Sequence, residues 1–269
     1  MVIYGRKQNE NMKKTLTIVK VGGKIVEDPA SLSQLLDRFS KIEGLKMLVH
    51  GGGRTATDVA GQLGIETHMV NGRRITDAQM LRVVTMVYGG LVNKNIVSQF
   101  SAMGLRVLGL TGADMNIVRS HRRPVTPEGV DYGFVGDVDS VDAEAIAMLV
   151  EGGVIPVIAP LTLGDGGQLL NTNADTMAGE TAKAMSRLYD VTLMFCFEKK
   201  GVLLDADDDE SVIPQITTES YAELKERGVV SGGMLPKLDN SFKALRGGVG
   251  RVVITRSDQI GLCGTTITL

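Results

Sequence analysis

The sequence predicts an α/β fold in which helices cover both faces of a mainly parallel sheet. Short runs of β-branched and apolar residues alternate along most of the chain with stretches whose apolar residues recur at helical spacing. Glycine-rich turns follow several of these runs, where parallel sheets connect strand to helix and bind ligands. The 269 residues, 43% of them hydrophobic, can bury a substantial core in one large domain or two closely joined lobes.

A βαβ unit opens the predicted fold. Residues 15–21 (TLTIVKV) and 45–50 (LKMLVH) are expected to be strands. The helix between them should begin at Asp28 and Pro29, because proline suits the first helical position. Its apolar stripe comprises Leu32, Leu35, Leu36 and Phe39.

The later elements continue the alternation. Thr76 and Gln79 match a capping box ahead of an apolar helical face, and the glycines at 89–90 are expected to break or kink that helix. Residues 115–138 predict short strands and turns. Further strands are predicted over residues 154–160 and 191–197. They flank a helix with the stripe Ala174, Met177, Ala178, Thr181 and Met185.

Composition points to a small-molecule protein. The formal charge of -2 and the pI near 6.0 give no bulk attraction for nucleic acid or an acidic membrane. Two cysteines far apart form neither a metal spacing nor a disulfide framework, which favours a reduced, cytoplasmic setting. The polar N-terminal segment lacks a signal-peptide core, Met12 is an alternative start, and no apolar run reaches membrane-spanning length.

Two successive apolar runs end in glycine pairs, IVKVGGK at 18–24 and LVHGGG at 48–53. Glycine allows close backbone approach to a ligand, and Lys20 supplies a point charge suited to phosphate. A lone glycine pair is more often a plain strand-to-helix turn, at roughly two to one, but two such turns favour a binding site. A dinucleotide site is disfavoured because Ala56 stands where G-x-G-x-x-G needs its last glycine; P-loop and protein-kinase signatures are absent.

Three more motifs carry polar residues at turns. In NTNADT, Asn173 suits a helix N-cap and Asp175 suits the first turn, so a helix start alone can explain both residues. Asn171 would face the same side of an extended segment as Asn173, so both side chains could contact a ligand. In SGGMLPK, Pro236 suits the first helical position, leaving Lys237 in a first turn that disfavours cations. That lysine needs an anion nearby, unless it extends to water.

The arginine pair of NGRRIT (71–76) matches a carboxylate or lies on the surface. No metal site is predicted: the acidic run 205–210 lacks calcium-loop spacing, and the three histidines lack ligand spacing.

Taken in order, seven motifs resemble the amino acid kinase superfamily, and within it the N-acetylglutamate kinases. They are IVKVGGK, LVHGGG, NGRRIT, DYGFVGDV, GGVIPVIAP, NTNAD and GGMLPK, spread over about residues 15–255. The resemblance implies a three-layer αβα sandwich with an open, mainly parallel central sheet. Residues 1–170 would bind the acyl amino acid and make a homodimer contact, and residues 171–269 would bind ATP. The reaction implied is phosphorylation of the γ-carboxylate of N-acetyl-L-glutamate in arginine biosynthesis.

The resemblance also implies roles for single residues. Lys20 and Lys237 would stabilise the phosphoryl group in transit, and Asp175 would orient both lysines. The implied substrate-binding residues are Gly52 and Gly53, through backbone N–H groups, with Arg74, Asn171 and Asn173. The implied ATP-binding residues are Gly22, Gly23, Glu198, Gly201, Val229, Val230 and Ser231.

The chemistry fits this inventory. A γ-carboxylate, with a reference pKa of about 4.3, is ionised at neutral pH and needs no general base. An anionic nucleophile must approach an anionic phosphoryl group, so catalysis should come from positioning, positive charge and Mg²⁺. We expect Mg²⁺ to be carried by ATP oxygens and water, since no carboxylate cluster is evident.

The chain also departs from the family pattern. FEKKGVL (197–203) stands where the nucleotide loop usually has TD or TN, and APLTLGDGG (159–167) replaces APIG, which makes N-succinyl-L-glutamate an alternative substrate. The N-terminal extension does not resemble the helix that builds arginine-inhibited hexamers, so a homodimer without arginine feedback is expected.

Competing hypotheses remain open. Carbamate kinase, aspartokinase, glutamate 5-kinase and uridylate kinase share the fold and the lysine chemistry. A catalytically silent ligand-binding regulator is a different class, against which the presence of Lys20, Asp175 and Lys237 together argues. A dehydrogenase is the least favoured.

Overall fold

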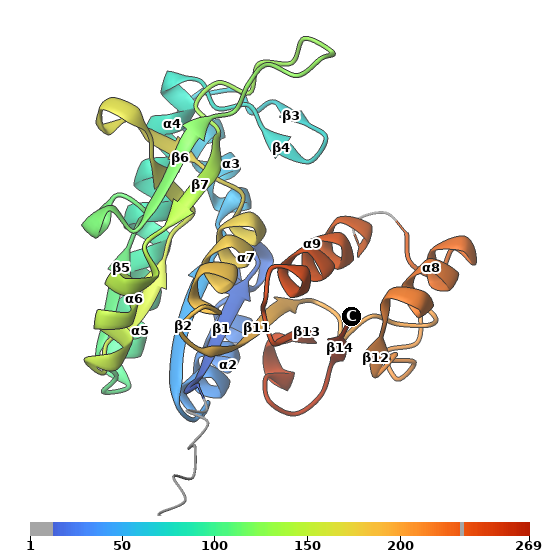
Figure 1. Ribbon diagram of the computed structural model, residues 1–269. Coiled ribbons are helices and arrows are strands. Elements are labelled where there is room, and N and C mark those ends of the chain that lie inside the picture. Colours follow the sequence, from blue (N-terminus) through green and yellow to red (C-terminus); the bar gives the residue numbers. More distant parts are fainter. Residues whose placement is uncertain (1–12, 232–233) are drawn as a thin grey trace, which may run out of the picture.

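The computed structural model describes residues 13–231 and 234–269 and has three layers, with a sheet between two layers of helices (Figure 1). The central sheet has the strand order β12-β14-β13-β11-β1-β2-β8-β5. Its strands are β1 (Thr15–Val21), β2 (Leu45–His50), β5 (Val107–Leu110), β8 (Ile155–Ile158), β11 (Asp190–Phe197), β12 (Gln215–Ile216), β13 (Arg251–Arg256) and β14 (Thr265–Ile267). The predicted αβα architecture is confirmed.

The sheet is mainly parallel, as predicted. Strand β1 pairs in parallel with both β2 and β11, and only the β13–β14 pair of the central sheet is antiparallel. Lys20 is in register with Val49 and Phe195. The carboxyl ends of β1, β2 and β11 therefore lie side by side, which brings the turns that follow them to one edge of the sheet.

Side chains alternate along each strand, so the sheet has two apolar faces. Val19 and Val21 of β1 pack in a core with one set of helices, while Leu16 and Ile18 pack on the opposite face. The first set is α2 (Pro29–Ser40), α3 (Gly53–Gln62), α4 (Ala78–Val84), the π-helix η1 (Thr85–Val92) and α5 (Asn93–Ala102), with the short α1 (Gly23–Glu27) before them. The other is α6 (Ala143–Glu151), α7 (Ala174–Met185), α8 (Thr218–Glu226) and α9 (Leu235–Arg246).

Smaller elements gather at the upper end of the molecule in Figure 1, above α7. Strands β6 (Val118–Arg122), β7 (Gly136–Val141), β9 (Leu161–Leu163) and β10 (Leu169–Asn171) form a second sheet in the order β10-β9-β6-β7. Strands β3 (Met69–Val70) and β4 (Arg73–Arg74) form a hairpin. Short 3₁₀ turns are η2 (Asp114–Asn116) and η3 (Asp165–Gly167); a third, η5 (Ser257–Gln259), follows β13 and contacts α2 instead.

Local helix signals were accurate at two starts. The Asp28 carboxylate accepts a hydrogen bond from the Ser31 N–H at 2.8 Å, and Pro29 is the first residue of α2. The Asn173 side chain caps α7 by accepting from the backbone N–H groups of Asp175 and Thr176. These polar groups satisfy donors that a helix leaves unpaired at its N-terminus.

Two predictions about the 76–90 region need correction. The Thr76–Gln79 capping box is wrong: Asp77 caps α4 by accepting from Met80 N–H at 2.8 Å, while the Thr76 hydroxyl donates to the Arg74 carbonyl. Asp77 is an equally good capping residue, so the sequence pattern placed the N-cap of this helix one residue too early. The glycines at 89–90 do not break the helix, because the chain passes through the π-helix η1 directly into α5; both glycines lie within η1, where regular α-helical turns are replaced, and the predicted kink stays a prediction.

The predicted lobe boundary at 170/171 falls inside β10, between its second and third residues, and stays a prediction. Met12 and most of the N-terminal extension lie outside the described residues. Among the helices that the structure describes, none combines the length and apolar character needed to cross a bilayer.

Candidate active site

The two glycine turns pack against each other. Gly51 donates its N–H to the Val21 carbonyl at 2.9 Å, and a Cβ on Gly51 would lie 3.3 Å from Gly23 N. A Cβ on Gly52 would lie 3.1 Å from the Tyr88 ring. Side chains at Gly51 and Gly52 would crowd this contact, which explains the glycines that follow β2; a Cβ on Gly22 or Gly23 would meet only ordinary contacts, at 3.9 Å and 3.5 Å.

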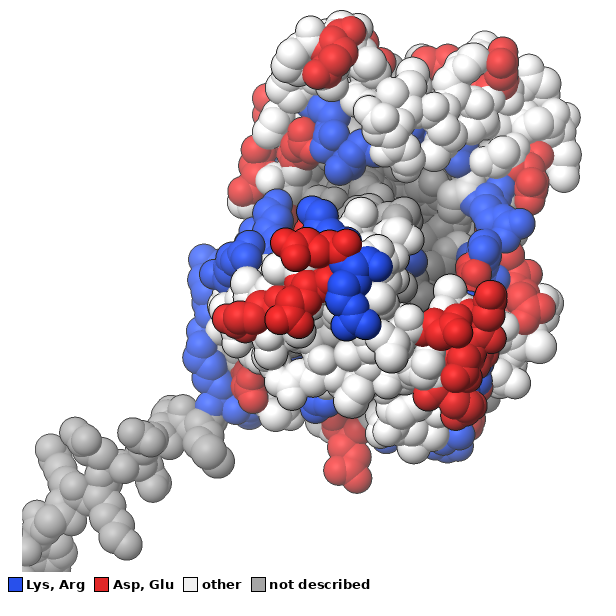
Figure 2. All heavy atoms as spheres, turned by 90° about the vertical axis from the view of Figure 1, so that its right-hand side faces the viewer, with Lys and Arg blue, Asp and Glu red and all other residues white. Residues whose placement is uncertain are grey.

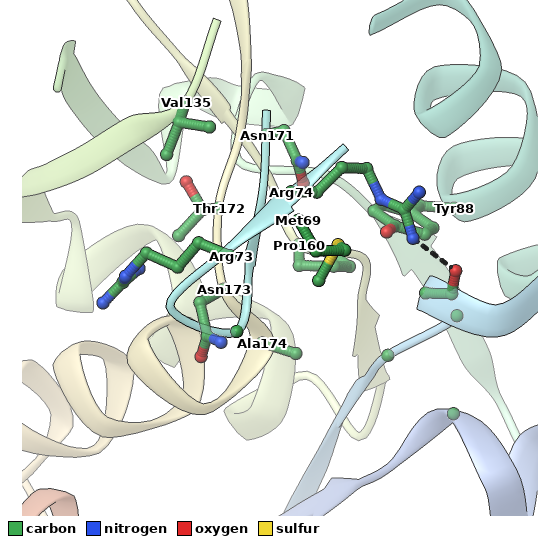
Figure 3. Close-up of a pocket in the computed structure, with 15 residues that line it drawn as sticks. Met69, Arg73, Arg74, Tyr88, Val135, Pro160, Asn171, Thr172, Asn173 and Ala174 are labelled. Carbon is green, nitrogen blue, oxygen red and sulfur yellow. Dashed lines mark hydrogen bonds between the residues drawn. The ribbon is translucent and has the colours of Figure 1, made fainter. Parts of the chain in front are cut away.

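The first cavity, which we call the hairpin cavity, has a volume of about 200 Å³. It lies between the β3–β4 hairpin, the Gly51–Gly53 turn, Tyr88 and the start of α7 (Figure 3). Its lining residues are Gly23, Gly51, Gly52, Gly53, Met69, Gly72, Arg73, Arg74, Tyr88, Val135, Pro160, Asn171, Thr172, Asn173 and Ala174. It contains all five residues expected to bind the acyl amino acid.

Arg74 is a buried cation fixed by neighbouring groups. Its guanidinium donates to the Gly53 carbonyl at 2.6 Å, to Thr57 Oγ1 at 2.9 Å and to Thr67 Oγ1 at 3.1 Å. Figure 3 shows the bond to Gly53 as a dashed line. The charge is thus held beside the N-terminus of α3, where backbone N–H groups already favour an anion.

The two asparagines also line this cavity. The buried Asn171 donates from Nδ2 to Thr76 Oγ1 at 2.9 Å, and Asn173 follows it at the start of α7. Because Asn173 Oδ1 is occupied in capping α7, its contact with a ligand would come from the remaining amide hydrogens.

Tyr88 and Arg73 line the hairpin cavity although neither was singled out as a binding residue from the sequence. Tyr88 comes from the π-helix η1, and burial raises the pKa of its phenol, so the hydroxyl remains a proton donor. Arg73 extends away from Arg74 in Figure 3 and forms no hydrogen bond or ion pair within the described part of the chain. The NGRRIT pair carried a signal for Arg73, whereas nothing in the local sequence indicated Tyr88.

The second cavity, the lysine cavity, has a volume of about 220 Å³ and contains both lysines predicted to be catalytic. Lys20 Nζ lies 2.7 Å from Asp175 Oδ1, with side-chain exposures of 7% and 21%. Lys237 is the third residue of α9, which begins at Leu235, so Pro236 is its second residue and not its first as predicted. Burial lowers the pKa of Lys237, an effect that the Asp175 charge opposes. The cavity is lined by Lys20, Gly22, Gly23, Lys24, Ile25, Asp175, Cys196, Phe197, Glu198 and Lys237.

The two cavities adjoin. Gly23 lines both of them, and consecutive residues at the start of α7 line one and then the other: Asn173 and Ala174 the hairpin cavity, Asp175 the lysine cavity. A ligand anion at the N-terminus of α3 would therefore lie next to the lysines. Figure 2 shows this part of the molecule hollowed, with Lys and Arg side chains beside the hollow.

Only some of the residues predicted to bind ATP line the lysine cavity. Gly22, Gly23 and Glu198 line the lysine cavity, but Gly201, Val229, Val230 and Ser231 do not. Val229 and Val230 follow α8 and donate their N–H groups to Leu224, with Val230 only 2% exposed. Ser231 is exposed, and Gly201 packs against Thr265. Roles for these four residues stay predictions.

His50 forms a hydrogen bond with the glycine turn that follows β2. Its Nδ1 lies 2.8 Å from the Gly51 carbonyl, which can only accept, so Nδ1 carries the proton and Nε2 accepts from Asn93 Nδ2 at 3.1 Å. The ring is fully buried, and desolvation lowers the pKa of His50 from 6.5 to about 4. The imidazole is therefore neutral at physiological pH.

This burial predicts a pH-dependent loss of stability. Because the pKa of His50 is lower in the folded chain, its contribution is complete above about pH 6.5 and is lost as the pH falls toward about 4. The loss should total on the order of 3 kcal/mol. Urea unfolding between about pH 7 and about pH 4.5 should show a flatter decline for His50→Gln than for the unmodified chain. His68→Gln, which removes an exposed imidazole, is the matched control; equal slopes for all three proteins would contradict the prediction.

The chain is similar to acyl amino acid kinases along almost its whole length. It matches the Amino acid kinase family over residues 15–256. It is 62% identical to the acetylglutamate kinase of Bacteroides fragilis, across 96% of this chain and 98% of that protein. It is 63% identical to the acetylglutamate kinase of Phocaeicola vulgatus, across 93% and 96%. A crystal structure from Streptococcus mutans aligns with a TM-score of 0.76 at 28% identity, across 94% of this chain and 98% of that one.

Proposed function

This chain belongs to the amino acid kinase family, and from that premise we propose that it transfers the γ-phosphoryl group of ATP to the γ-carboxylate of N-acetyl-L-glutamate. The observation that carries the proposal is the junction of the hairpin cavity with the lysine cavity at Gly23. An acceptor in one cavity and the phosphates of ATP in the other would meet there. The product is the acyl phosphate, formed in the second step of arginine biosynthesis.

The acceptor is held by donors and cations suited to a dicarboxylate. The γ-carboxylate accepts from the backbone N–H groups of Gly52 and Gly53 at the N-terminus of α3, where the helix dipole favours negative charge. Arg74 and Asn171 hold the α-carboxylate and the amide end, with Asn173 beside them. Since the γ-carboxylate is ionised at neutral pH, one of its oxygens attacks the γ-phosphorus directly and no proton has to move.

The lysines reduce the repulsion between nucleophile and phosphoryl group. Lys20 and Lys237 approach the phosphoryl oxygens from β1 and from the first turn of α9, and stabilise the charge as the bond to the β-phosphate oxygen breaks. Asp175 fixes Lys20 through its 2.7 Å ion pair and attracts Lys237. The apolar walls provided by Ile25 and Phe197 strengthen these electrostatic interactions by limiting water.

ATP phosphates lie along Gly22 and Gly23, and Glu198 lies at the nucleotide side. The described residues contain no group of three His, Cys, Asp or Glu side chains that could cage a metal ion. The two carboxylates of the lysine cavity are each paired with a lysine, Asp175 with Lys20 and Glu198 with Lys24. This donor set fits Mg²⁺ that enters with ATP, keeps mainly phosphate and water ligands, and neutralises phosphate charge.

The decisive assay measures ADP release with N-acetyl-L-glutamate, free glutamate, aspartate, carbamate and UMP as acceptors. We expect turnover to be far greatest with the acylated glutamate. Turnover only with another acceptor would assign the chain to a different branch of the superfamily. Nucleotide binding without turnover on any acceptor would favour a silent regulator.

N-succinyl-L-glutamate is a second candidate acceptor, and Arg73 is the observation that favours it. Arg73 lines the hairpin cavity, and its guanidinium forms no salt bridge with any of the described residues. A succinyl group differs from an acetyl group by an added carboxylate, which an arginine fork binds well.

Arg73→Leu distinguishes the two acceptors. If Arg73 binds the succinyl carboxylate, the change should raise the KM for N-succinyl-L-glutamate by about 10- to 100-fold, the value of a charge-assisted hydrogen bond, with little effect on N-acetyl-L-glutamate. Steady-state kinetics with both acceptors provide the measurement, and Arg119→Leu, an exposed arginine of β6, provides the control. A wild-type kcat/KM that is higher for the acetyl compound would exclude the second candidate.

The proposal also includes a homodimer and a cytoplasmic location. A homodimer through residues 1–170 is supported by the exposed apolar side chains of Met86 and Leu91 on η1, with exposures of 54% and 58%. A cytoplasmic setting is supported by the two unpaired cysteines, Cys196 and Cys263. ATP binding is assigned to residues 171–269 together with the turn at Gly22 and Gly23.

A further inference from the structure

An aromatic ring lies beneath the two ammonium groups of the lysine cavity. Phe197 is the last residue of β11, and its side chain is on the same face of the sheet as Lys20, because Lys20 is in register with Phe195. The rings of Phe195 and Phe197 are stacked, with centroids 6.1 Å apart and planes 9° from parallel. Phe197 is the first residue of the FEKKGVL segment (197–203).

The ring relates differently to the two lysines. Lys237 Nζ lies 3.5 Å from the Phe197 centroid, whereas Lys20 Nζ lies 5.5 Å from it. Both distances are within the range of cation–π attraction, and the shorter one is the stronger contact. Lys20 has Asp175 as its ionic partner, while Lys237 forms no salt bridge with any residue that the structure describes.

Lys237 needs a neighbouring group that attracts and orients its ammonium. It lies in the first turn of α9, where the helix dipole disfavours a cation, and it is partly removed from water. Its flexible stem would otherwise leave the ammonium in many positions. A carboxylate would hold it but would also occupy at least one of its hydrogen-bond donors and offset part of the charge that attracts a phosphoryl group. The π face attracts the cation and leaves N–H donors free.

We propose that Phe197 is a positioning residue that holds the Lys237 ammonium inside the lysine cavity through a cation–π contact, ready for the phosphoryl group. The inference rests on the proposed phosphoryl transfer. Phe197 touches neither reacting atom in this role. It acts by fixing where the charge of Lys237 lies before and during transfer.

Stepwise fluorination of the ring tests the electrostatic part of the contact at nearly constant shape. Incorporation of mono-, di- and trifluorophenylalanine at position 197 should lower kcat progressively, with log kcat falling in proportion to the loss of cation–π strength. The trifluoro protein should lose on the order of 10-fold, as should Phe197→Leu. The alkaline limb of the kcat profile should also move to lower pH, because a weaker π contact stabilises the charged lysine less.

The same substitutions at Phe195 serve as the control, since that ring stacks on Phe197 but has no ammonium over it in the described structure. We expect kcat and its pH profile to change little there. Equal trends at both positions would mean that stacking is responsible, and an unchanged kcat across the series at position 197 would overturn the inference while leaving the kinase proposal intact.

A measurement without turnover keeps the two proposals separate. In protein carrying ¹³C-labelled lysine, the ε-methylene resonance of Lys237, assigned by its loss in Lys237→Arg, should be shifted upfield by the ring current. Phe197→Leu should abolish that shift. An absent shift in the unmodified protein would overturn the inference even if the acyl glutamate is phosphorylated, and a shift with no turnover would leave only the proposed function in error.

Discussion

Lys237→Ala is expected to lower kcat by about 10²- to 10³-fold while changing the KM for the acyl amino acid by less than about threefold. The ammonium of Lys237 lines the lysine cavity, whereas the acceptor residues line the hairpin cavity. Its loss should therefore remove stabilisation of the migrating phosphoryl group and leave acceptor binding largely intact. Steady-state kinetics with N-acetyl-L-glutamate and ATP varied separately would measure this difference.

Lys243→Ala is the matched control for this prediction. Lys243 lies on the same helix, α9, but its side chain is 66% exposed and pairs with Glu180 at 3.3 Å. We expect nearly unchanged kinetics, because exposed ion pairs contribute little. A Lys237→Ala enzyme with normal kcat, or one that loses only acceptor affinity, would show that Lys237 has a different role from the one proposed here.

Local sequence signals predicted the parts of the fold that neighbouring residues determine. The start of α2 at Asp28 and Pro29 and the cap of α7 at Asn173 depend on side chains within three residues of the bonds that they make. The start of α4 was misplaced because Thr76 and Asp77 are both good capping residues, and only the Thr76 hydroxyl's bond to Arg74 settles the choice.

Parts of the candidate site depend on contacts between segments that are distant in the sequence, and the sequence pattern did not predict these contacts. Tyr88 reaches the Gly52 turn because a π-helix replaces regular α-helical turns between α4 and α5, which periodicity does not reveal. Phe197 resembled an ordinary strand residue until the register of β11 with β1 placed it beside Lys20. The ordered motifs indicated the candidate site residues, but not the side chains that support them.

Asp175→Asn should both destabilise the protein and slow the reaction. The variant keeps the side-chain shape and the Asn173 cap of α7, but removes the only ionic partner of Lys20 among the described residues. The Lys20 side chain is 7% exposed, so a nearly buried charge would be left unpaired. Breaking a buried pair in this way costs about 3–5 kcal/mol, which urea unfolding at neutral pH would measure as a lower midpoint with an unchanged m-value.

Bound ATP should partly restore the stability that Asp175→Asn loses. The phosphates bring negative charge to Lys20 and Lys237, and without the Asp175 carboxylate they meet less repulsion. The variant should therefore bind ATP more tightly by calorimetry, and should gain more stability from saturating ATP than the unmodified chain does. Its kcat should nevertheless fall by about 10²-fold, because lysines drawn to the ground-state phosphates are no longer held for the transition state. Glu180→Gln, on the same helix at the Lys183 and Lys243 pairs, is the control. Weaker ATP binding in Asp175→Asn would mean that the carboxylate contributes to binding the nucleotide, and not mainly to orienting the two cations.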